Sequence, residues 1–422
     1  MGHSAAPGPP SGRRVVDPPV NGRPVLMIVH SHYEEDPRVR REAESIVASG
    51  RPVVVLGLRL AGQDETGELA GVRIRRLDVQ RHHGAGIGVY LREYLDFFVR
   101  AAWTAIRLHR REHFALVQVH SLPDFLAFAA LPLRLAGVPL ILDLHEAMPE
   151  FFRTRFPRAS NPITHRLLLL QERASIGISA VTLSVNAAMQ DRLIGFGVSP
   201  AKLAVVKNSP SLARFDASAY PRRAFREDGS LRLVYTGGLI PTYEVDVALR
   251  ALATIAAERP DLDARLDVFG RGDTEASLKT LAGELGIADR VTFHGRIPID
   301  DVPAAVAAAD IGLAPTRHDQ FTDLSLSGKV FEYGAMGKPV IASALPMLIA
   351  MFPPGTVTTY PSGDTAAMVN AILTLADDPA IRAAAVGRTE AIVRDAAWEH
   401  ESVGYLKLVE GLIAGTRRTD RS

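Results

Sequence analysis

The chain has 422 residues, of which 47% are hydrophobic and 23% are charged, which predicts two globular domains and excludes a largely disordered protein. Lys and Arg number 48 against 47 Asp and Glu, so the net charge of +1 gives no indication of a nucleic-acid partner. The absence of Cys excludes disulfides, thiolate metal sites and a catalytic thiol, and because it indicates a reducing compartment we expect a cytoplasmic protein.

Neither the N-terminus nor the most apolar stretch has the pattern of a targeting or membrane-spanning segment. Residues 1–22 are rich in Pro, Gly, Ser and Ala, and we expect them to form a disordered tail. The most apolar stretch, residues 125–144, is interrupted by Pro132, Arg134 and Pro139. A spanning helix needs about 20 mostly apolar residues, so a helix followed by a buried strand explains this stretch better.

Short apolar runs alternate with amphipathic helical patterns in residues 23–208. Buried strands are predicted at 24–30, 53–58, 116–120, 140–144, 181–185 and 203–207. Helices are predicted at 36–48, 89–111, 124–135, 163–176 and 187–195. Because the strands are apolar almost throughout, they indicate a parallel sheet covered by helices on both faces, and therefore one α/β domain.

A polar stretch, residues 209–230, is a candidate linker, after which the same alternation begins again. Strands are predicted at 231–235, 264–269, 291–293, 311–314, 340–342 and 357–360. Helices are predicted at 243–258, 274–285, 302–309, 328–336, 364–375, 379–393 and 398–412. Residues 231–394 are therefore expected to form a second α/β domain, and residues 395–415 a terminal helix. Ligands of such sheets bind outside the carboxyl ends of the strands, which places the expected site between the two domains.

The stretch 325–343 is the most informative in the chain. Ser327 and Gly328 suit the start of a helix, where free backbone N–H groups favour a phosphate, and Lys329 follows in the first turn. Glu332, about one turn into the helix, could accept hydrogen bonds from two ribose hydroxyls. The alternative is a capped amphipathic helix in which Glu332 is merely solvated.

Glycines follow two of the predicted strands in the second half. Gly237 and Gly238 would let the backbone approach a ligand closely, although a tight turn explains them equally well. Arg271 lies between Gly270 and Gly272, but Glu275 occupies the third glycine position of a dinucleotide fingerprint, which counts against an NAD enzyme.

Three strand ends of the first half carry histidines, which are His30 with His32, His120, and His145 followed by Glu146. Because these strand ends are expected to share one edge, the histidines indicate either a functional rim or ordinary hydrogen-bonded loop residues. A helical His pair with metal-ligand spacing is absent, so we expect no metal.

Together these segments resemble the retaining glycosyltransferases of the GT-B type, glycosyltransferase family four (group 1). The resemblance covers nearly the whole chain from about residue 24. Its most specific part runs from Glu332 to Ser343, and it is supported by residues 36–39, 206–208, 235–238 and 293–295. It implies two Rossmann-like domains facing each other across a cleft, a last helix that crosses back to the N-terminal domain, and no metal or other cofactor. It also implies transfer of a sugar, with retention of configuration, from a nucleotide diphosphate-sugar to a glycan or lipid-linked acceptor, as in polysaccharide biosynthesis.

The resemblance also implies roles for individual residues. Glu332 would bind the ribose, His145 would lie near the transferred sugar, and His145 and Glu146 are the polar candidates for catalysis. The other expected donor contacts are Gly237, Gly238, Arg271, Gly295, Arg296, Asp323, Ser327, Gly328 and Lys329, and the expected acceptor-side residues are His30, His32, Arg38 and His120.

The sequence departs from the family pattern at two places. Leu324 stands where the family often has a glutamate directed at the sugar, with Asp323 beside it. Residues 239–243 lack the basic pair that often follows the Gly-Gly turn. We therefore expect Lys329, or Arg271 in its place, to offset the charge of the diphosphate.

Residues 151–158 interleave Phe with Arg, and Leu167 to Leu170 follow on a helix with Arg166 and Arg173 nearby, a mixture that suits an interface with anionic headgroups. We expect this segment to contact a charged acceptor or the inner face of an anionic membrane, and a loop beside a core helix is the alternative.

For the whole chain, a nucleotide-sugar glycosyltransferase is the leading hypothesis. A sugar-nucleotide epimerase of the same fold and a catalytically silent binding relative are the alternatives.

Overall fold

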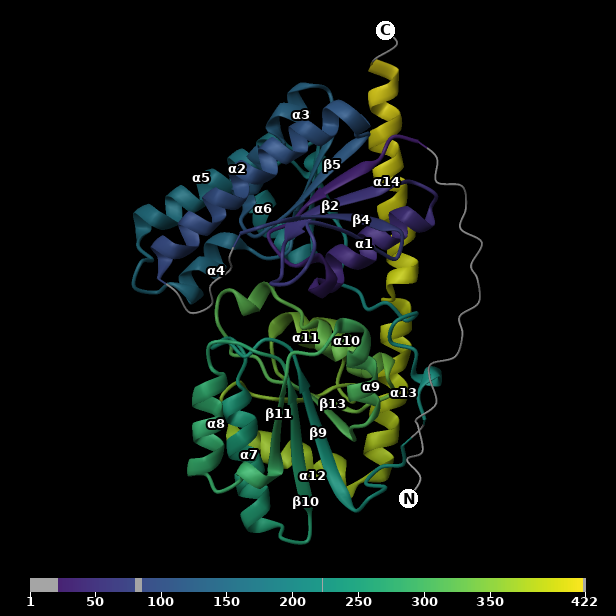
Figure 1. Cartoon of the computed structure of the whole chain (residues 1–422). Helices are drawn as coiled ribbons and strands as arrows, with labels where there is room; N and C mark the ends of the chain where they lie inside the picture. The colour runs from purple at the N-terminus through teal and green to yellow at the C-terminus, as the bar shows by residue number, and fades with distance from the viewer. Residues whose placement is uncertain (1–21, 80–85, 222, 420–422) are drawn as a thin grey trace.

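The computed structural model describes residues 22–79, 86–221 and 223–419, with the side chains of 416–419 left aside. The tail predicted at residues 1–22 therefore lies almost wholly outside the described residues. The described chain forms two parallel-sheet α/β halves, one above the other in Figure 1.

The first half is built on an eight-stranded sheet of order β3-β4-β2-β1-β5-β6-β7-β8. All neighbouring strands run parallel except β3 and β4, which are antiparallel. The strands are β1 (Val25–Ile28), β2 (Val53–Leu58), β3 (Thr66–Leu69), β4 (Val72–Leu77), β5 (Leu116–His120), β6 (Leu140–Leu144), β7 (Val181–Ser184) and β8 (Leu203–Val205). The inner strands β1, β2, β5 and β6 are buried along their whole length, which agrees with their apolar sequences.

Two helix layers cover this sheet. One face carries α2 (Ile87–Glu112), the 3-10 helix η2 (Asp124–Ala130), α3 (Leu131–Leu135), α5 (Pro162–Ile178) and α6 (Ala187–Gly195). The other face carries α1 (Pro37–Ala48) and the last helix, α14 (Trp398–Thr419). Figure 1 shows α2, α3 and α5 on the left of the sheet and α14 on its right. The short helix α4 (Met148–Arg155) follows β6 near the second half.

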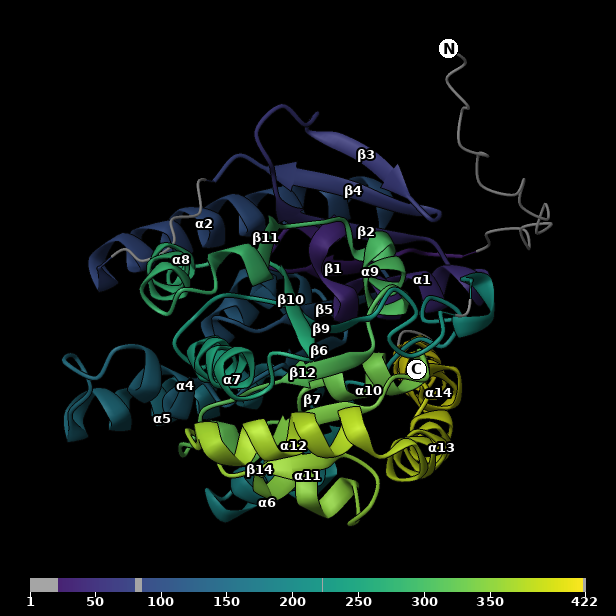
Figure 2. The same cartoon turned by 90° about the horizontal axis from the view of Figure 1, so that it is seen from below.

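The second half contains a six-stranded parallel sheet of order β11-β10-β9-β12-β13-β14. Its strands are β9 (Ser230–Thr236), β10 (Asp263–Phe269), β11 (Val291–Gly295), β12 (Ile311–Ala314), β13 (Val340–Ser343) and β14 (Thr358–Tyr360). One face packs on α7 (Val245–Glu258), α8 (Glu275–Glu284) and α12 (Thr365–Asp377), and the other packs on α9 (Val302–Ala307), α10 (Gly328–Ala335), α11 (Pro346–Met351) and α13 (Pro379–Asp395). In the view from below, the second half lies in front of the first, so the halves are stacked (Figure 2).

The last helix returns to the first half, as the family resemblance implied. Side chains of α14 (Trp398, Tyr405, Val409 and Ile413) share a buried cluster with those of β1, β2 and α1. The indole N–H of Trp398 donates to Ser45 Oγ at 2.8 Å. Burial of these aromatic and aliphatic groups stabilises the crossing.

The structure contains elements that the sequence patterns did not predict. Strands β3 and β4 form an edge hairpin whose polar residues alternate with apolar ones, because only one side is covered. Helix α4 is formed within the segment that includes 151–155, and α11 lies between β13 and β14. The helix predicted at 124–135 is 3-10 helical in its first seven residues and α-helical only from Leu131.

Candidate active site

A cleft of about 1140 Å³ lies between the two halves, at the carboxyl ends of strands from both sheets. The first half contributes residues that follow β1, β5 and β6, together with residues of α2 and α4. The second half contributes residues that follow β9, β10, β11 and β12. The cleft therefore occupies the place where ligands of open parallel sheets bind.

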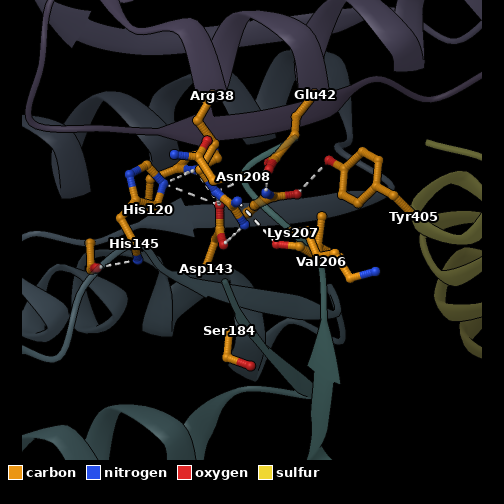
Figure 3. Close-up of polar contacts among 12 residues, drawn as sticks. Arg38, Glu42, His120, Asp143, His145, Ser184, Val206, Lys207, Asn208 and Tyr405 are labelled. Carbon is orange, nitrogen blue, oxygen red and sulfur yellow. Dashed lines mark hydrogen bonds and ion pairs between the residues drawn. The ribbon is translucent and has the colours of Figure 1, made fainter. Parts of the chain in front are cut away.

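The wall of the first half is organised around Asp143, which is fully buried at the end of β6 (Figure 3). Arg38 donates to both carboxylate oxygens of Asp143, from Nε at 2.9 Å and from Nη2 at 2.6 Å. His120 Nδ1 and His145 Nε2 lie 3.0 and 3.1 Å from Asp143 Oδ2, and 3.1 Å from each other. His145 lines the cleft, whereas Arg38 and His120 are buried behind it. The network therefore fixes His145, its member that a ligand in the cleft can reach.

A second set of buried polar groups continues this network to the last helix. Glu42 forms an ion pair with Arg38 at 3.2 Å and accepts a hydrogen bond from Gln118 Nε2 at 2.7 Å. The hydroxyl of Tyr405, on α14, donates to Gln118 Oε1 at 2.8 Å. An unbroken chain of contacts thus joins the C-terminal helix to His145 in the cleft.

The charges in this network set the direction of its pKa shifts. Burial alone would raise the pKa of Asp143, but Arg38 and the two histidines hold it well below its usual range. Burial would likewise lower the pKa of His120, but its hydrogen bond to Asp143 and the negative charge of that carboxylate outweigh this effect, and the pKa is raised. The pKa of Glu42 is raised by burial and by the negative charge of Asp143. The network therefore favours a protonated His120 that donates to an ionised Asp143.

Two further carboxyl groups line the same wall. Asp36 is the N-cap of α1, where it accepts from Val39 N at 3.1 Å and from Ser31 Oγ at 2.8 Å. Burial would raise the pKa of Asp36, but His145 and these hydrogen bonds lower it. Burial raises the pKa of Glu146 to about 7, so that this carboxyl can exchange a proton near neutral pH.

Backbone turns rich in glycine form the opposite wall. Gly237 N donates to Phe269 O at 2.8 Å, so the turns that follow β9 and β10 are joined. A Cβ on Gly270 would lie 1.8 Å from the carbonyl oxygen of Gly237, so a side chain there would separate the turns. Gly237, Gly238 and Arg271 all line the cleft, where a ligand can approach the backbone closely.

Lys329 lies against this wall from the first turn of α10. Its ammonium group is 3.9 Å from the ring centroid of Tyr243 and 5.3 Å from that of Tyr235. A Cβ on Gly237 would lie 2.9 Å from Lys329 Nζ, which places this cation directly beside the glycine turn. Among the described residues, Lys329, Arg271 and Arg317 have no acidic partner within ion-pair distance, and both arginines line the cleft.

Glu332 lies one turn further along α10, and burial raises its pKa. The positive charges that oppose this shift are Lys329, Arg41 and Arg214, but no described residue forms an ion pair or hydrogen bond with its carboxylate. Ser327, the N-cap residue, makes no side-chain capping bond, and its buried hydroxyl has no partner among the described residues. Gly328 lies beside Asn208, whose amide nitrogen would be 3.8 Å from a Cβ there.

The segment 151–158, expected to meet a membrane or a charged acceptor, instead contacts the second half of the chain. Arg155 donates to Asp273, and Arg153 donates to Gln320. Thr154 Oγ1 donates to Asp319 Oδ2 at 3.1 Å. Two of its three arginines are therefore engaged with the second half, and contact of this segment with a membrane stays a prediction.

Several predicted site residues lie elsewhere than expected. Arg38 and His120 are buried rather than exposed on the acceptor side, and His32 points its Nδ1 at Leu58 O, 3.3 Å away. Asp323 pairs with His318 at 2.7 Å and does not line the cleft. Gly295 lies behind Arg271. His30 and Arg296 do line the cleft, and Arg296 forms an ion pair with Glu35 across it at 2.8 Å.

The sequence analysis missed other residues of the cleft. Tyr90 and Tyr94, in the first turns of α2, line it beside Phe156 and Arg155, and Arg317 lines it from the second half. The role of Asp143 was also missed. Strands β5 and β6 pair so that His120 lies opposite Asp143, and the position of both residues near strand ends was the signal that could have revealed their contact. The aromatic residues of α2 gave no such signal, since their periodicity is equally typical of a core helix.

His120, Asp143 and His145 are close enough together to be tested as a metal site, since their ligand atoms lie within 4.8 Å of one another. The arrangement fits a cation poorly, because the guanidinium of Arg38 already occupies both carboxylate oxygens. A second positive charge there would be repelled by Arg38. The geometry instead suits a neutral or polar group held by His145 and Glu146, with an anionic group on the opposite wall.

Comparison with known proteins places this arrangement in a family. A sequence profile described as glycosyl transferase 4-like domain matches residues 36–209, and one described as glycosyl transferases group 1 matches residues 230–378. Sucrose-phosphate synthase of Thermosynechococcus elongatus superimposes with a TM-score of 0.73 at 19% identity, over 93% of this chain and all of that one. The fold is therefore GT-B, and the chain belongs to the group 1 glycosyltransferases.

Two relatives illustrate the range of the family. The chain is 24% identical over 361 residues to 2-deoxystreptamine glucosyltransferase of Streptomyces kanamyceticus, covering 82% of this chain and 83% of the relative. It is 30% identical over 191 residues to a GDP-mannose-dependent monoacylated alpha-(1-6)-phosphatidylinositol monomannoside mannosyltransferase of Corynebacterium glutamicum, covering 45% of this chain and 49% of that protein. Both are glycosyltransferases, but their acceptors differ in chemistry.

Proposed function

We propose that this glycosyltransferase holds a nucleotide diphosphate-sugar on the second-half wall of the cleft and transfers the sugar to an acceptor on the first-half wall. The observation that carries the proposal is the set of three cations, Lys329, Arg271 and Arg317, that have no acidic partner among the described residues and adjoin the glycine turns. A diphosphate supplies the missing negative charge. Glu332, which no described residue pairs, is free to accept from the ribose hydroxyls.

In the proposed reaction, the bond between the anomeric carbon and the diphosphate oxygen breaks while the acceptor oxygen attacks from the same face, which retains the configuration. The leaving diphosphate gains negative charge, and Lys329, Arg271 and Arg317 stabilise it. The acceptor proton passes to the leaving diphosphate. His145, fixed by Asp143, positions the sugar, and Glu146 exchanges protons close to it near neutral pH.

No metal ion is required in this proposal. The fixed cations perform the charge stabilisation that a metal would otherwise supply, and Arg38 already occupies the carboxylate of the His120–Asp143–His145 cluster. Activity should therefore be unchanged after treatment with a chelator. Loss of activity with EDTA, restored by a divalent cation, would show that the phosphates bind a metal instead.

The aromatic residues on the first-half wall support a glycan or glycolipid acceptor. Tyr90 and Tyr94 line the cleft together with Phe151 and Phe156, and aromatic faces bind the apolar faces of sugar rings. The Corynebacterium relative acts, by its name, on a phosphatidylinositol mannoside, which makes a lipid-linked acceptor the first to test. An acceptor of this kind implies contact with a membrane surface.

A catalytically silent relative is the second candidate, because Leu324 occupies the position of the sugar-directed glutamate. The side chain of Leu324 packs on the apolar cluster of the first half, and its carbonyl oxygen accepts from Asn186 Nδ2 at 2.7 Å. This position is therefore used to join the two halves rather than to contact a sugar. The epimerase alternative has no observation in its favour, since the relatives described above are transferases by name.

Two measurements test the proposal. Thermal shift with UDP, GDP and ADP should identify a nucleotide that raises the melting temperature, because a ligand that binds only the folded chain stabilises it. With the matching nucleotide-sugar, release of free nucleotide should then depend on an added acceptor. Release without acceptor would indicate an epimerase or hydrolase, binding without turnover would indicate a silent relative, and absence of any nucleotide binding would refute the proposal.

A further inference from the structure

The helix layer on one face of the first sheet exposes an unusual amount of apolar surface. Among the described residues, fourteen large hydrophobic side chains are exposed, and eleven of them lie on α2, α3, α5 and α6 or directly after α6. The eleven are Val89, Leu91, Leu95, Val99, Trp103, Leu135, Ile163, Leu167, Leu170, Ile194 and Phe196. Soluble monomers seldom gather exposed apolar groups in one region, so this layer is a candidate interaction surface.

The clearest part of the surface is a stripe along α2. Leu91, Leu95, Val99 and Trp103 follow one another at four-residue spacing and are 50–62% exposed. They lie opposite the buried face of the helix, which includes Phe97, Ala101 and Ala105. On α5, Ile163, Leu167 and Leu170 form a second exposed row, 59–71% accessible. We refer to these seven side chains as the outer face.

The helices around the outer face carry many exposed arginines and few exposed acidic residues. Helices α2, α3 and α5 carry eight exposed arginines, which are Arg92, Arg100, Arg107, Arg110, Arg111, Arg134, Arg166 and Arg173. Of the four acidic residues on these helices, Glu93 and Glu172 are buried, while Asp96 pairs with Arg100 and Glu112 with Arg73. Since the whole chain has a net charge of only +1, these three helices carry an excess of exposed positive charge.

We propose that the outer face docks on an anionic lipid bilayer. Apolar side chains that project from a helix lying in the interface enter the acyl boundary, while arginines beside them reach the headgroup phosphates. Charge complementarity selects this occupant over a second copy of the chain, because a symmetric pair would bring arginine against arginine. None of the helices in the described part of the chain is long and apolar enough to cross a bilayer, so contact would be peripheral.

The position of α2 connects this surface to the proposed reaction. Tyr90 and Tyr94 line the cleft from the same helix turns that carry Leu91 and Leu95 on the outer face. A lipid-linked acceptor could therefore keep its tail in the bilayer while its headgroup reaches the cleft. This consequence rests on the proposed function, whereas docking itself does not.

Sedimentation with vesicles tests the docking. The full chain should bind vesicles that contain phosphatidylglycerol at least about tenfold more strongly than vesicles of phosphatidylcholine alone, and salt should weaken the binding. The triple variant Leu95→Ser, Val99→Ser, Leu167→Ser should lose about tenfold in partitioning. The matched control, Ile349→Ser with Ile381→Ser, replaces exposed apolar groups of the second half and should bind as the original chain does.

The intrinsic fluorescence of the chain provides a second readout. Its two tryptophans differ in exposure, since Trp103 is 62% exposed and Trp398 is buried. Binding to anionic vesicles should shift the emission to shorter wavelength as Trp103 leaves water. No shift, equal binding to neutral vesicles, or unchanged binding by the triple variant would each overturn the docking.

Nucleotide binding separates failure of docking from failure of the proposed function. The triple variant should retain the melting temperature of the original chain and its thermal shift with the nucleotide diphosphate, because its changed side chains project into solvent. If the chain binds vesicles but no nucleotide, the docking proposal is supported and the proposed transferase function is refuted. A chain that binds nucleotide but self-associates through the outer face without binding vesicles would overturn the docking alone.

Discussion

The two walls of the cleft differ in whether their charged side chains are paired with one another. On the first-half wall, Asp143, Arg38, Glu42 and His120 are buried and bonded to one another, so their charges are matched before any ligand arrives. Beside the second-half wall, Lys329 and Glu332 are partly accessible and have no ion-pair partner among the described residues. Groups that satisfy one another stabilise the fold, whereas groups left without partners are available to a ligand. Substitutions in the first wall should therefore change stability, and substitutions in the second should change binding.

The largest effect is expected for Asp143→Asn. The variant removes one of the two carboxylates that pair with the buried guanidinium of Arg38, and breaking a buried ion pair typically costs about 3–5 kcal/mol. Urea unfolding should show this loss. The control is Asp261→Asn, which removes an exposed partner of Arg259 and should leave the unfolding midpoint in place. A midpoint equally unchanged for Asp143→Asn would mean that the first wall is not a stability element.

Glu332→Gln should weaken ligand binding without lowering stability, whereas Asp143→Asn should lower stability. The loss of a charged acceptor should weaken nucleotide diphosphate binding by about 1.5–3 kcal/mol in a titration. The free energy of unfolding should not fall, because the carboxylate of Glu332 has no partner among the described residues to lose. A stability loss comparable with that of Asp143→Asn would contradict the contrast between the walls.

Lys329→Ala tests which part of the nucleotide the second wall binds. The affinity for the diphosphate should fall by about 1.5–3 kcal/mol, the scale of a charge-assisted hydrogen bond, while the affinity for the uncharged nucleoside stays the same. Titration with both ligands gives the comparison. Equal losses would assign Lys329 to the base pocket or the helix, and no loss would transfer the role to Arg271 or Arg317.

Glu146 gives the first wall a pH dependence. Its pKa is 4.5 in the unfolded chain and about 7 after burial, so the folded state binds more protons between these values. The free energy of unfolding should therefore fall as pH rises through this window, at up to about 1.4 kcal/mol per pH unit. In Glu146→Gln this contribution to the slope should disappear. A slope that is the same in both proteins would show that Glu146 does not titrate there.

The smallest effect is expected for Tyr405→Phe, at the far end of the first-wall network. Loss of the hydrogen bond to Gln118 should cost about 0.5–1.5 kcal/mol in urea unfolding, with nucleotide binding unchanged. Tyr360→Phe is a matched control in the second half, because it removes a buried hydroxyl that accepts a hydrogen bond from Ser343 Oγ. Weaker nucleotide binding in Tyr405→Phe alone would mean that the network reaches the second wall.

Much of the fold follows from local pattern. The apolar runs that form β2, β5, β6 and β12 predicted those strands to the residue, because strands buried on both faces must be apolar throughout. The edge hairpin β3–β4 and helix α4 were not predicted, since partly exposed elements carry mixed sequences with no clear period.

For the candidate site, the sequence predicted which polar residues lie near strand ends, but it did not predict which side chains they contact. Strand-end position together with the family resemblance led to His145, Glu146, Gly237 and Gly238, and the structure places all four on the cleft. The resemblance also assigned His120, at a strand end, and Arg38, in the first turn of a helix, to the acceptor side, where their burial keeps them from a ligand. Strand ends indicate the edge of a sheet, but they do not say whether a side chain there points inward or into the cleft.

The sequence by itself determined the alternation of strands and helices, the family and the edge on which the site lies, because these depend on local periodicity and short motifs. Tertiary structure alone decided how charge is distributed. Lys329, Arg271 and Arg317, the cations proposed to take the role of the basic pair absent after Gly238, come from three different loops or helices. Arg153 and Arg155, from the segment predicted to contact a membrane or an acceptor, form hydrogen bonds with the opposite half. Charges act through distance and burial, and neither quantity can be read from positions along the chain.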